Sequence, residues 1–100
     1  MENLKTFRSK IDNIDKQMTQ LLEERLIISL QIASLKTKDQ LPLANPDRER
    51  EVFEKNLLNL KNHLFKDEVK EFFTVLISLS KRVQANKYPN LNSPIEELGR

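Results

Sequence analysis

The sequence contains no cysteine or tryptophan, and it has one glycine in 100 residues. Without cysteine there can be no disulfide framework, no thiolate metal site and no cysteine nucleophile. A single glycine argues against an all-β sandwich or barrel, because those folds need many tight turns with positive φ. The lone histidine, His63, excludes a multi-histidine metal centre and leaves none to spare for a hydrolytic triad. We therefore predict no metal site.

Long apolar runs and a strong charge imbalance are also missing. Seventeen Lys and Arg against fifteen Asp and Glu give a net charge of +2, which is too even for a protein that coats nucleic acid, although any anion site must be locally basic. The N-terminus, MENLKTFRSK, has no apolar signal core, and no apolar run approaches the ~20 residues of a membrane span. We predict a small, cytoplasmic, helical protein with no nucleic-acid or membrane partner.

What the sequence does contain is helical periodicity. Apolar residues recur at alternating spacings of three and four, the heptad pattern of a helix packed along a seam. We call these residues the seam: Leu4, Phe7, Ile11, Ile14, Met18, Leu21, Ile28, Ile32 and Leu35. No Gly or Pro interrupts residues 3–38, so we predict one unbroken helix there. A second stripe, made of Leu22, Leu26, Leu30 and Ala33, occurs only in the later half, which predicts burial of that half on two sides.

Two further helices follow. Asn45 as N-cap and Pro46 at the first helical position predict a second helix over about residues 46–62. A third apolar stripe predicts a helix over about residues 66–87. Residues 89–100 contain turn formers without a clear period, which predicts a loose tail after one domain.

The length of the first helix has a consequence for assembly. A helix of 35 residues is about 50 Å long, whereas a compact chain of this size is only about 33 Å across. The first helix must therefore protrude and expose its seam unless a partner covers it, and a second copy is the simplest partner. We predict an all-α fold with three helices per chain in one domain, residues 1–88, assembled as an intertwined homodimeric helix bundle.

Polar residues occupy positions where the pattern demands apolar ones. Arg25 lies on the seam, and Lys36 lies three full turns later on the same face. Glu49 shares the apolar face of the second helix, and Ser80 and Gln84 continue the stripe of the third. Each alone has a structural explanation: a buried ion pair, a register device, an interhelical hydrogen bond or compensation of a helix dipole.

Taken together, these residues predict a binding site, because burying unsatisfied charge is costly. Arg25 and Lys36, with Arg48 at the start of the second helix, suit a small ligand that carries more than one carboxylate.

The ordered set of polar residues resembles that of the AroQ-type, all-helical chorismate mutases. The matching segments are FRSKIDNIDKQMTQLLEERLIISLQIASLK (7–36), NPDRERE (45–51) and SLSKRVQ (78–84). The resemblance implies a homodimer of three-helix chains that converts chorismate into prephenate, the shikimate-pathway branch toward phenylalanine and tyrosine. That rearrangement transfers no proton and needs no covalent intermediate, so no cofactor is expected.

The resemblance also implies roles for individual residues. Lys36 and Gln84 would act on the ether oxygen of the substrate, and Glu49 would hold its C4 hydroxyl. Arg25 would bind one carboxylate, and Arg8 from the partner subunit would bind the other. The rest of the lining would be Ile32, Asn45, Arg48 and Ser80. Asn45 stands where close relatives often have Asp, so a role there would pass to its backbone N–H.

Three alternatives remain open from the sequence. Two share the fold: a lyase that splits isochorismate into salicylate and pyruvate, and a mutase for the 4-amino analogue of chorismate. Glu49 and the segment NPDRERE favour the chorismate mutase over the lyase. The third is a non-catalytic helical dimerisation module, which predicts apolar or freely replaceable residues at 25, 36, 49 and 84, where the sequence has none that is apolar.

Overall fold

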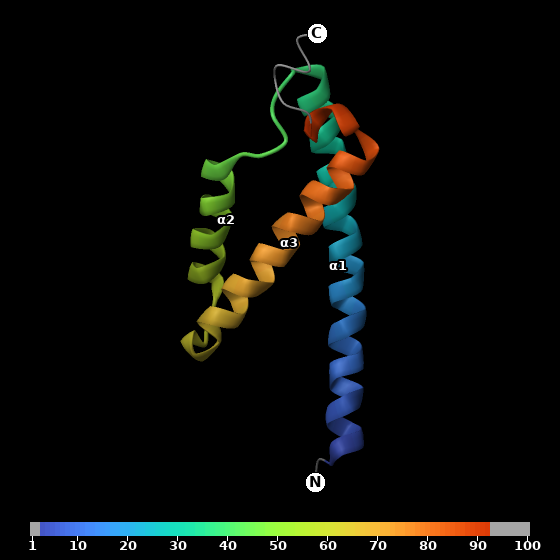
Figure 1. Cartoon of the computed structure of the whole chain (residues 1–100). Helices are drawn as coiled ribbons and strands as arrows, with labels where there is room; N and C mark the ends of the chain where they lie inside the picture. The colour runs from blue at the N-terminus through green and yellow to red at the C-terminus, as the bar shows by residue number, and fades with distance from the viewer. Residues whose placement is uncertain (1–2, 93–100) are drawn as a thin grey trace.

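The computed structural model describes residues 3–92, and these residues form helices joined by short connections (Figure 1). The order is α1 (Leu4–Lys38), α2 (Pro46–Asn59), the 3-10 helix η1 (His63–Phe65), α3 (Lys66–Lys87) and the 3-10 helix η2 (Pro89–Asn92). No strand occurs within the described range. The predicted all-α class with a very long first helix is confirmed.

Asparagine caps fix the starts of the first two helices. The Asn3 side-chain oxygen accepts the backbone N–H of Thr6 at 3.0 Å at the start of α1. At the start of α2, the Asn45 side-chain oxygen accepts the backbone N–H of Arg48 at 3.1 Å, and Pro46 occupies the first helical position. Both devices satisfy donors that the first turn of a helix leaves unpaired. The start predicted for the second helix is therefore correct.

The end of α2 differs from the prediction. The sequence predicts a helix to about residue 62, whereas α2 ends at Asn59 and Leu60 is extended. Asn62 is the reason for the early break, because its side-chain oxygen accepts the backbone N–H of Leu64 at 3.1 Å and starts η1. Asparagine side chains commonly compete with the helix in this way.

The predicted loose tail is also corrected in part. Residues Pro89–Asn92 form the short helix η2, which lies near the C-terminal ends of α1 and α3 (Figure 1). Residues 93–100, the rest of the predicted tail, lie outside the described residues.

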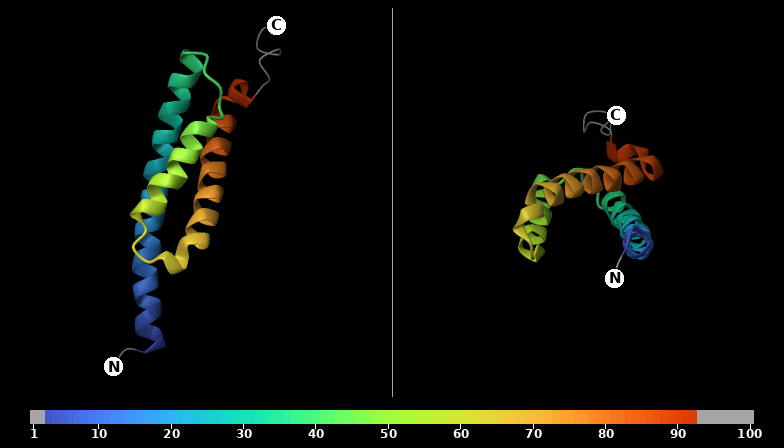
Figure 2. Two further views of the ribbon diagram at one scale, coloured as in Figure 1. Left: turned by 90° about the vertical axis from the view of Figure 1, so that its left-hand side faces the viewer. Right: turned by 90° about the horizontal axis from the view of Figure 1, so that it is seen from below.

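The three helices form an open arrangement rather than a closed bundle. Helix α3 packs against both α1 and α2 and runs between them in the view of Figure 1, whereas seen from below α1 and α2 lie at its two ends (Figure 2). The buried apolar side chains are few: Ala33, Val52, Leu76 and Ile77. Ser29 and Ala33, one turn apart on α1, are small and buried, which lets α3 approach α1 closely. The core is thus concentrated where α3 crosses the later half of α1.

The earlier half of α1 extends beyond the other helices (Figures 1 and 2). The molecule measures 67 × 24 × 16 Å, and its radius of gyration is 17.5 Å, against about 13 Å for a compact chain of 100 residues. All nine seam residues are exposed, from 44% for Ile32 to 62% for Leu4 and Leu21. The second stripe is buried or half-buried. Within residues 3–92, no helix combines the length and apolarity needed to cross a membrane.

Candidate active site

A pocket of about 380 Å³ lies where the later half of α1 meets α2 and α3. Eight of the nine side chains predicted for the site line it, and the ninth, Arg8, does not. The eight are Arg25, Ile32, Lys36, Asn45, Arg48, Glu49, Ser80 and Gln84. The remaining lining residues are Ile28, Ser29, Leu43, Val52, Ile77 and Lys81.

The way α1 ends positions Lys36. Gln40 adopts a left-handed conformation with φ 57°, so that the backbone N–H of Leu41 reaches the carbonyl oxygen of Lys36 at 2.8 Å. This is the hydrogen bond of a Schellman helix end. The chain then doubles back, and the Lys36 ammonium donates to the carbonyl oxygen of Leu43 at 2.7 Å. The amine is therefore held at the pocket by the loop that follows its own helix.

The electrostatics of Lys36 reflect this placement. Burial lowers the pKa of Lys36 below the usual value of a lysine, nearby Glu49 opposes that shift, and the positive charge of Lys81 adds to it. Because burial disfavours the charged form of an amine, the Lys36 ammonium is primed to gain from a bound anion.

Arg25 and Ser80 connect α1 with α3. The Arg25 guanidinium donates to the hydroxyl oxygen of Ser80 at 2.5 Å. Burial, followed by repulsion from Arg48, lowers the pKa of Arg25. Two guanidinium groups that repel each other across a concave surface form a site that an anion stabilises.

Gln84 makes the second connection between these helices. Its side-chain amide is buried and donates to the carbonyl oxygen of Ser29 at 2.8 Å. A glutamine NH₂ carries two hydrogens, so this bond orients the amide and leaves one hydrogen to donate within the pocket. The small side chains of Ser29 and Ala33 make the close approach possible.

Glu49 and Lys81 close the pocket between α2 and α3. The Lys81 ammonium donates to the two carboxylate oxygens of Glu49 at 3.3 and 3.5 Å. Both side chains are mostly covered, with 29% of Glu49 and 37% of Lys81 exposed. This ion pair joins α2 to α3 through two residues that are 32 positions apart in the sequence.

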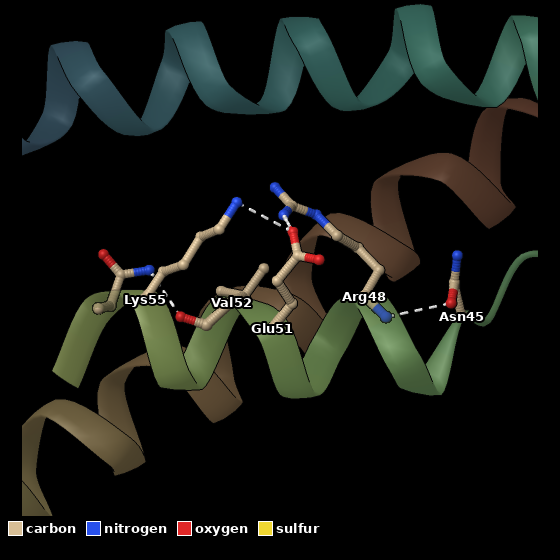
Figure 3. Close-up of polar contacts among 6 residues, drawn as sticks. Asn45, Arg48, Glu51, Val52 and Lys55 are labelled. Atoms are coloured by element: carbon tan, nitrogen blue, oxygen red, sulfur yellow. Dashed lines mark hydrogen bonds and ion pairs between the residues drawn. The ribbon is translucent and has the colours of Figure 1, made fainter. Parts of the chain in front are cut away.

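Arg48 takes part in a row of ion pairs along α2, together with Glu51 and Lys55. Figure 3 shows the Arg48 and Lys55 side chains directed to the side of α2 that faces α1, with the Glu51 carboxylate between them. Glu51 lies 2.5 Å from the Arg48 guanidinium and 3.1 Å from the Lys55 amine. Hydrogen bonds from Lys55, which has the larger effect, and from Arg48 lower the pKa of Glu51. Arg48 is thus oriented by its own helix, with Asn45 capping that helix beside it.

Arg8 is separated from the pocket by the length of α1. It precedes Arg25 by seventeen residues on the same helix, which corresponds to about 25 Å along the axis. No arginine side chain spans that distance. Within one chain, the structure therefore does not bring Arg8 to the other eight residues.

Six lining residues were not assigned to the site from the sequence. Three are apolar, namely Ile28, Val52 and Ile77, and the other three are Ser29, Leu43 and Lys81. Ser29 and Leu43 contribute backbone carbonyl oxygens, which no side-chain pattern reveals. Lys81 directly follows Ser80 in the matched segment SLSKRVQ, and its position between two stripe residues was the available signal.

The pocket is strongly cationic. It is lined by four cations, namely Arg25, Lys36, Arg48 and Lys81, and by one carboxylate, Glu49. Among residues 3–92 there is no group of three His, Cys, Asp or Glu side chains placed to hold a metal ion. An excess of positive charge beside hydrogen-bonding side chains is the arrangement that recognises a small polyanion.

The chain is all-helical within the described residues and has a cationic pocket where three helices meet. These features place it among helical proteins suited to binding a small polyanion. The comparisons narrow this class: residues 7–85 match the family described as chorismate mutase type II. The chain belongs to that family.

Named relatives agree with the family. The chain is 38% identical over 92 residues to a bifunctional chorismate mutase/prephenate dehydratase of Aquifex aeolicus, covering 84% of this chain and 25% of the relative. It is 28% identical over 85 residues to a chorismate mutase of Methanocaldococcus jannaschii, and this match covers 84% of this chain and 86% of the relative. The chain thus spans about a quarter of the length of the bifunctional relative and most of the M. jannaschii protein. No solved structure matches the chain significantly.

Proposed function

We propose that this chain is a chorismate mutase, which rearranges chorismate to prephenate. The observation that carries the proposal is the composition of the pocket: four cations, one carboxylate and an oriented glutamine amide meet in about 380 Å³. Chorismate is a dianion with two carboxylates, an ether oxygen and one hydroxyl. One carboxylate, the ether oxygen and the hydroxyl would each have a chemically matched partner among the residues that line the pocket.

The chemistry needs positioning and electrostatics rather than a nucleophile. In the rearrangement the C–O bond of the ether breaks while a C–C bond forms within the same molecule, and negative charge develops on the ether oxygen. Lys36 and the second amide hydrogen of Gln84 would donate to that oxygen, and Arg25 would hold one carboxylate. Acceleration of even 10⁶-fold needs about 8 kcal/mol of differential stabilisation, and preorganised donors at a developing charge are the largest single source of it.

Glu49 has a distinct role in this proposal. The chorismate dianion offers a single conventional hydrogen-bond donor, its C4 hydroxyl. Glu49 supplies the one carboxylate of the pocket lining, and a carboxylate accepts hydrogen bonds only. Glu49 would therefore accept a hydrogen bond from the C4 hydroxyl and fix the orientation of the ring, against which Ile32 would pack. Ser80, Arg48 and the backbone at Asn45 would complete the polar lining.

We further propose that the active unit is an intertwined homodimer. The nine exposed seam residues support this. So does a second, largely apolar groove of about 680 Å³ between α1 and α3, lined by residues such as Met18, Leu22, Phe73 and Leu79. A second copy of α1 has the complementary apolar face. In such a dimer, the partner's α1 would bring Arg8 to the pocket, where it would hold the second carboxylate.

Product identification tests the proposed function. The protein would be incubated separately with chorismate and with isochorismate, and the products identified by chromatography and mass. We expect prephenate from chorismate. Salicylate and pyruvate from isochorismate, without prephenate from chorismate, would make the chain a lyase of the same fold. No conversion of either compound by the folded protein would overturn the enzymatic proposal in favour of a binding or dimerisation module.

A further inference from the structure

Lys81 is the charged residue of the pocket for which the proposed reaction has no task. It lies on α3 beside Ser80, lines the pocket and forms an ion pair with Glu49 across to α2. Lys36, Arg25 and Arg48 already supply cations for the dianion. A further ammonium, placed against the single carboxylate of the lining, changes what that carboxylate attracts.

We propose that Lys81 is a specificity-determining residue, which makes the pocket select a neutral hydroxyl and reject an ammonium at the ring position that faces Glu49. The inference rests on the proposed function, because it assumes a ligand of the chorismate type. It names the compound rejected: 4-amino-4-deoxychorismate, in which an amine replaces the C4 hydroxyl.

The reasoning begins with a bare carboxylate. An unpaired carboxylate in a partly buried pocket attracts an ammonium more strongly than it attracts a hydroxyl, since the first interaction is between opposite charges and the second is not. An allylic amine is protonated at neutral pH. Glu49 alone would therefore favour the amino compound over chorismate.

Lys81 reverses this preference. Its ammonium lies 3.3 Å from one Glu49 oxygen and 3.5 Å from the other, so the carboxylate charge is already compensated. A ligand ammonium that contacted Glu49 would also meet the like charge of Lys81. Lys36 adds to the repulsion, because its pKa responds to the charges of both Glu49 and Lys81. A neutral hydroxyl can donate to the same carboxylate without this repulsion, and both paired side chains are covered enough to limit screening by water.

The test compares kcat/KM for the two compounds in four proteins. Lys81→Met keeps the length of the side chain and removes its charge, and Lys81→Arg keeps the charge. Lys70→Met removes an exposed charge from the same helix as a matched control. Because like charges in contact are a strong basis for rejecting a wrong partner, we expect Lys81→Met to shift the ratio of the two kcat/KM values toward the amino compound by about tenfold or more. Lys81→Arg and Lys70→Met should keep the wild-type ratio.

The outcomes separate this inference from the proposed function. An unchanged ratio in Lys81→Met, with both kcat/KM values lowered equally, would overturn the inference and reduce Lys81 to a structural tie between α2 and α3. A second variant, Lys81→Gln, gives the same comparison if Lys81→Met does not fold. If the wild-type protein converts neither compound, the proposed function fails, and calorimetric binding of both compounds to wild type and Lys81→Met still measures the discrimination; equal binding ratios there would overturn the inference as well.

Discussion

The two halves of α1 share one periodicity and have opposite surroundings. Residues 4–20 carry seam residues and, in the part of the chain that the structure describes, all of them except Thr6 are exposed. Residues 21–38 carry the seam and the second stripe, and α3 packs against the second stripe. The seam remains exposed even in this covered half. The comparison teaches that packing within one chain accounts for the second stripe, whereas most of the seam is left for the proposed homodimer to cover.

The same division separates the residues of the proposed site. Arg8 lies on the uncovered half, and Arg25 and Lys36 lie on the covered half with the pocket. If the uncovered half serves another copy, each copy completes the pocket of the other. Four experiments test this division, in order of decreasing expected effect.

Exchange between two damaged chains is the strongest test. Lys36→Ala should lower kcat on chorismate by about 10²–10³-fold, the effect of removing one donor to a developing charge. Arg8→Ala should lower kcat/KM strongly, because one carboxylate of the substrate loses its cation. Lys38→Ala, an exposed control on the same helix, should keep its activity. When the two inactive chains are unfolded together and refolded, about half of the dimers are mixed, and each mixed dimer has one intact site. About a quarter of all sites should then regain activity.

The mixed refolding distinguishes a site shared between two chains from a site built by one chain, because Arg8 and Lys36 lie far apart on α1. Arg8 and Lys36 are 28 residues apart on one helix, about 42 Å along its axis. If one chain supplied both residues to a site, every site in the mixture would carry a lesion. Mixed dimers verified by mass but without regained activity would contradict the shared site.

A charge on the uncovered half should break the assembly. Ile14→Asp places a carboxylate on the seam, where burial of each isoleucine contributes about 1.5–3 kcal/mol and burial of an unpaired charge is unfavourable. We expect monomers by sedimentation and a large loss of helical circular dichroism on mild heating. Leu58→Asp, at an apolar residue of α2 that is 86% exposed and lies off the seam, should change stability by less than about 0.5 kcal/mol. Equal behaviour of the two variants would remove the seam from the interface.

The pH dependence of activity should report the protonation of Lys36, which lies on the covered half of α1. Lys36 must be protonated to donate to the ether oxygen, and burial lowers its pKa below the usual 10.5. We therefore expect kcat/KM to fall on the alkaline side below pH 10.5. Lys36→Arg should retain residual activity and move that fall to higher pH, because a guanidinium stays protonated beyond pH 12. A fall at the same pH in both proteins would assign it to another group.

The smallest effect concerns the end of the covered half. Gln40 has a φ of 57°, which costs a residue with a Cβ about 1–2 kcal/mol, and glycine avoids this cost at the expense of greater freedom in the unfolded chain. Gln40→Gly should raise the free energy of unfolding by about 0.5 kcal/mol in urea titrations. Gln31→Gly, at an exposed position inside α1, should lower it by about 1 kcal/mol. Stabilisation by both or by neither would contradict the role given to the left-handed turn.

Local signals explain which parts of the structure could be predicted. The start of α2 follows from a cap and a proline that act within one turn, Asn45 and Pro46. The end of α2 could not be located, because Asn62 forms a competing hydrogen bond that depends on the conformation of the following turn.

The site shows the same boundary between local and tertiary information. Charged or polar residues on apolar stripes predicted five of the lining residues, since burial of each demands a partner: Arg25, Lys36, Glu49, Ser80 and Gln84. Arg48 followed from its place at the start of the second helix, and Ile32 and Asn45 followed only from the family resemblance. Lys81 was not predicted, because a lysine followed by Arg82 has the pattern of a solvated helix face. Only the packing of α2 against α3 brings Glu49 within 3.3 Å of its amine. The carbonyl oxygen of Ser29 was not predicted either, because only the packing of α3 against α1 brings it to the Gln84 amide.

The unbroken helix α1 also restricts where the chain can change in length. Insertion of one residue between Arg8 and Lys36 would turn the two ends of α1 by about 100° relative to each other and displace them by about 1.5 Å, so at least one of them would leave its face. The connections at residues 39–45 and 60–65 carry no such phase relation across the molecule. Length differences among members that share this site should therefore collect in the connections, while the spacing from Arg8 to Lys36 stays fixed.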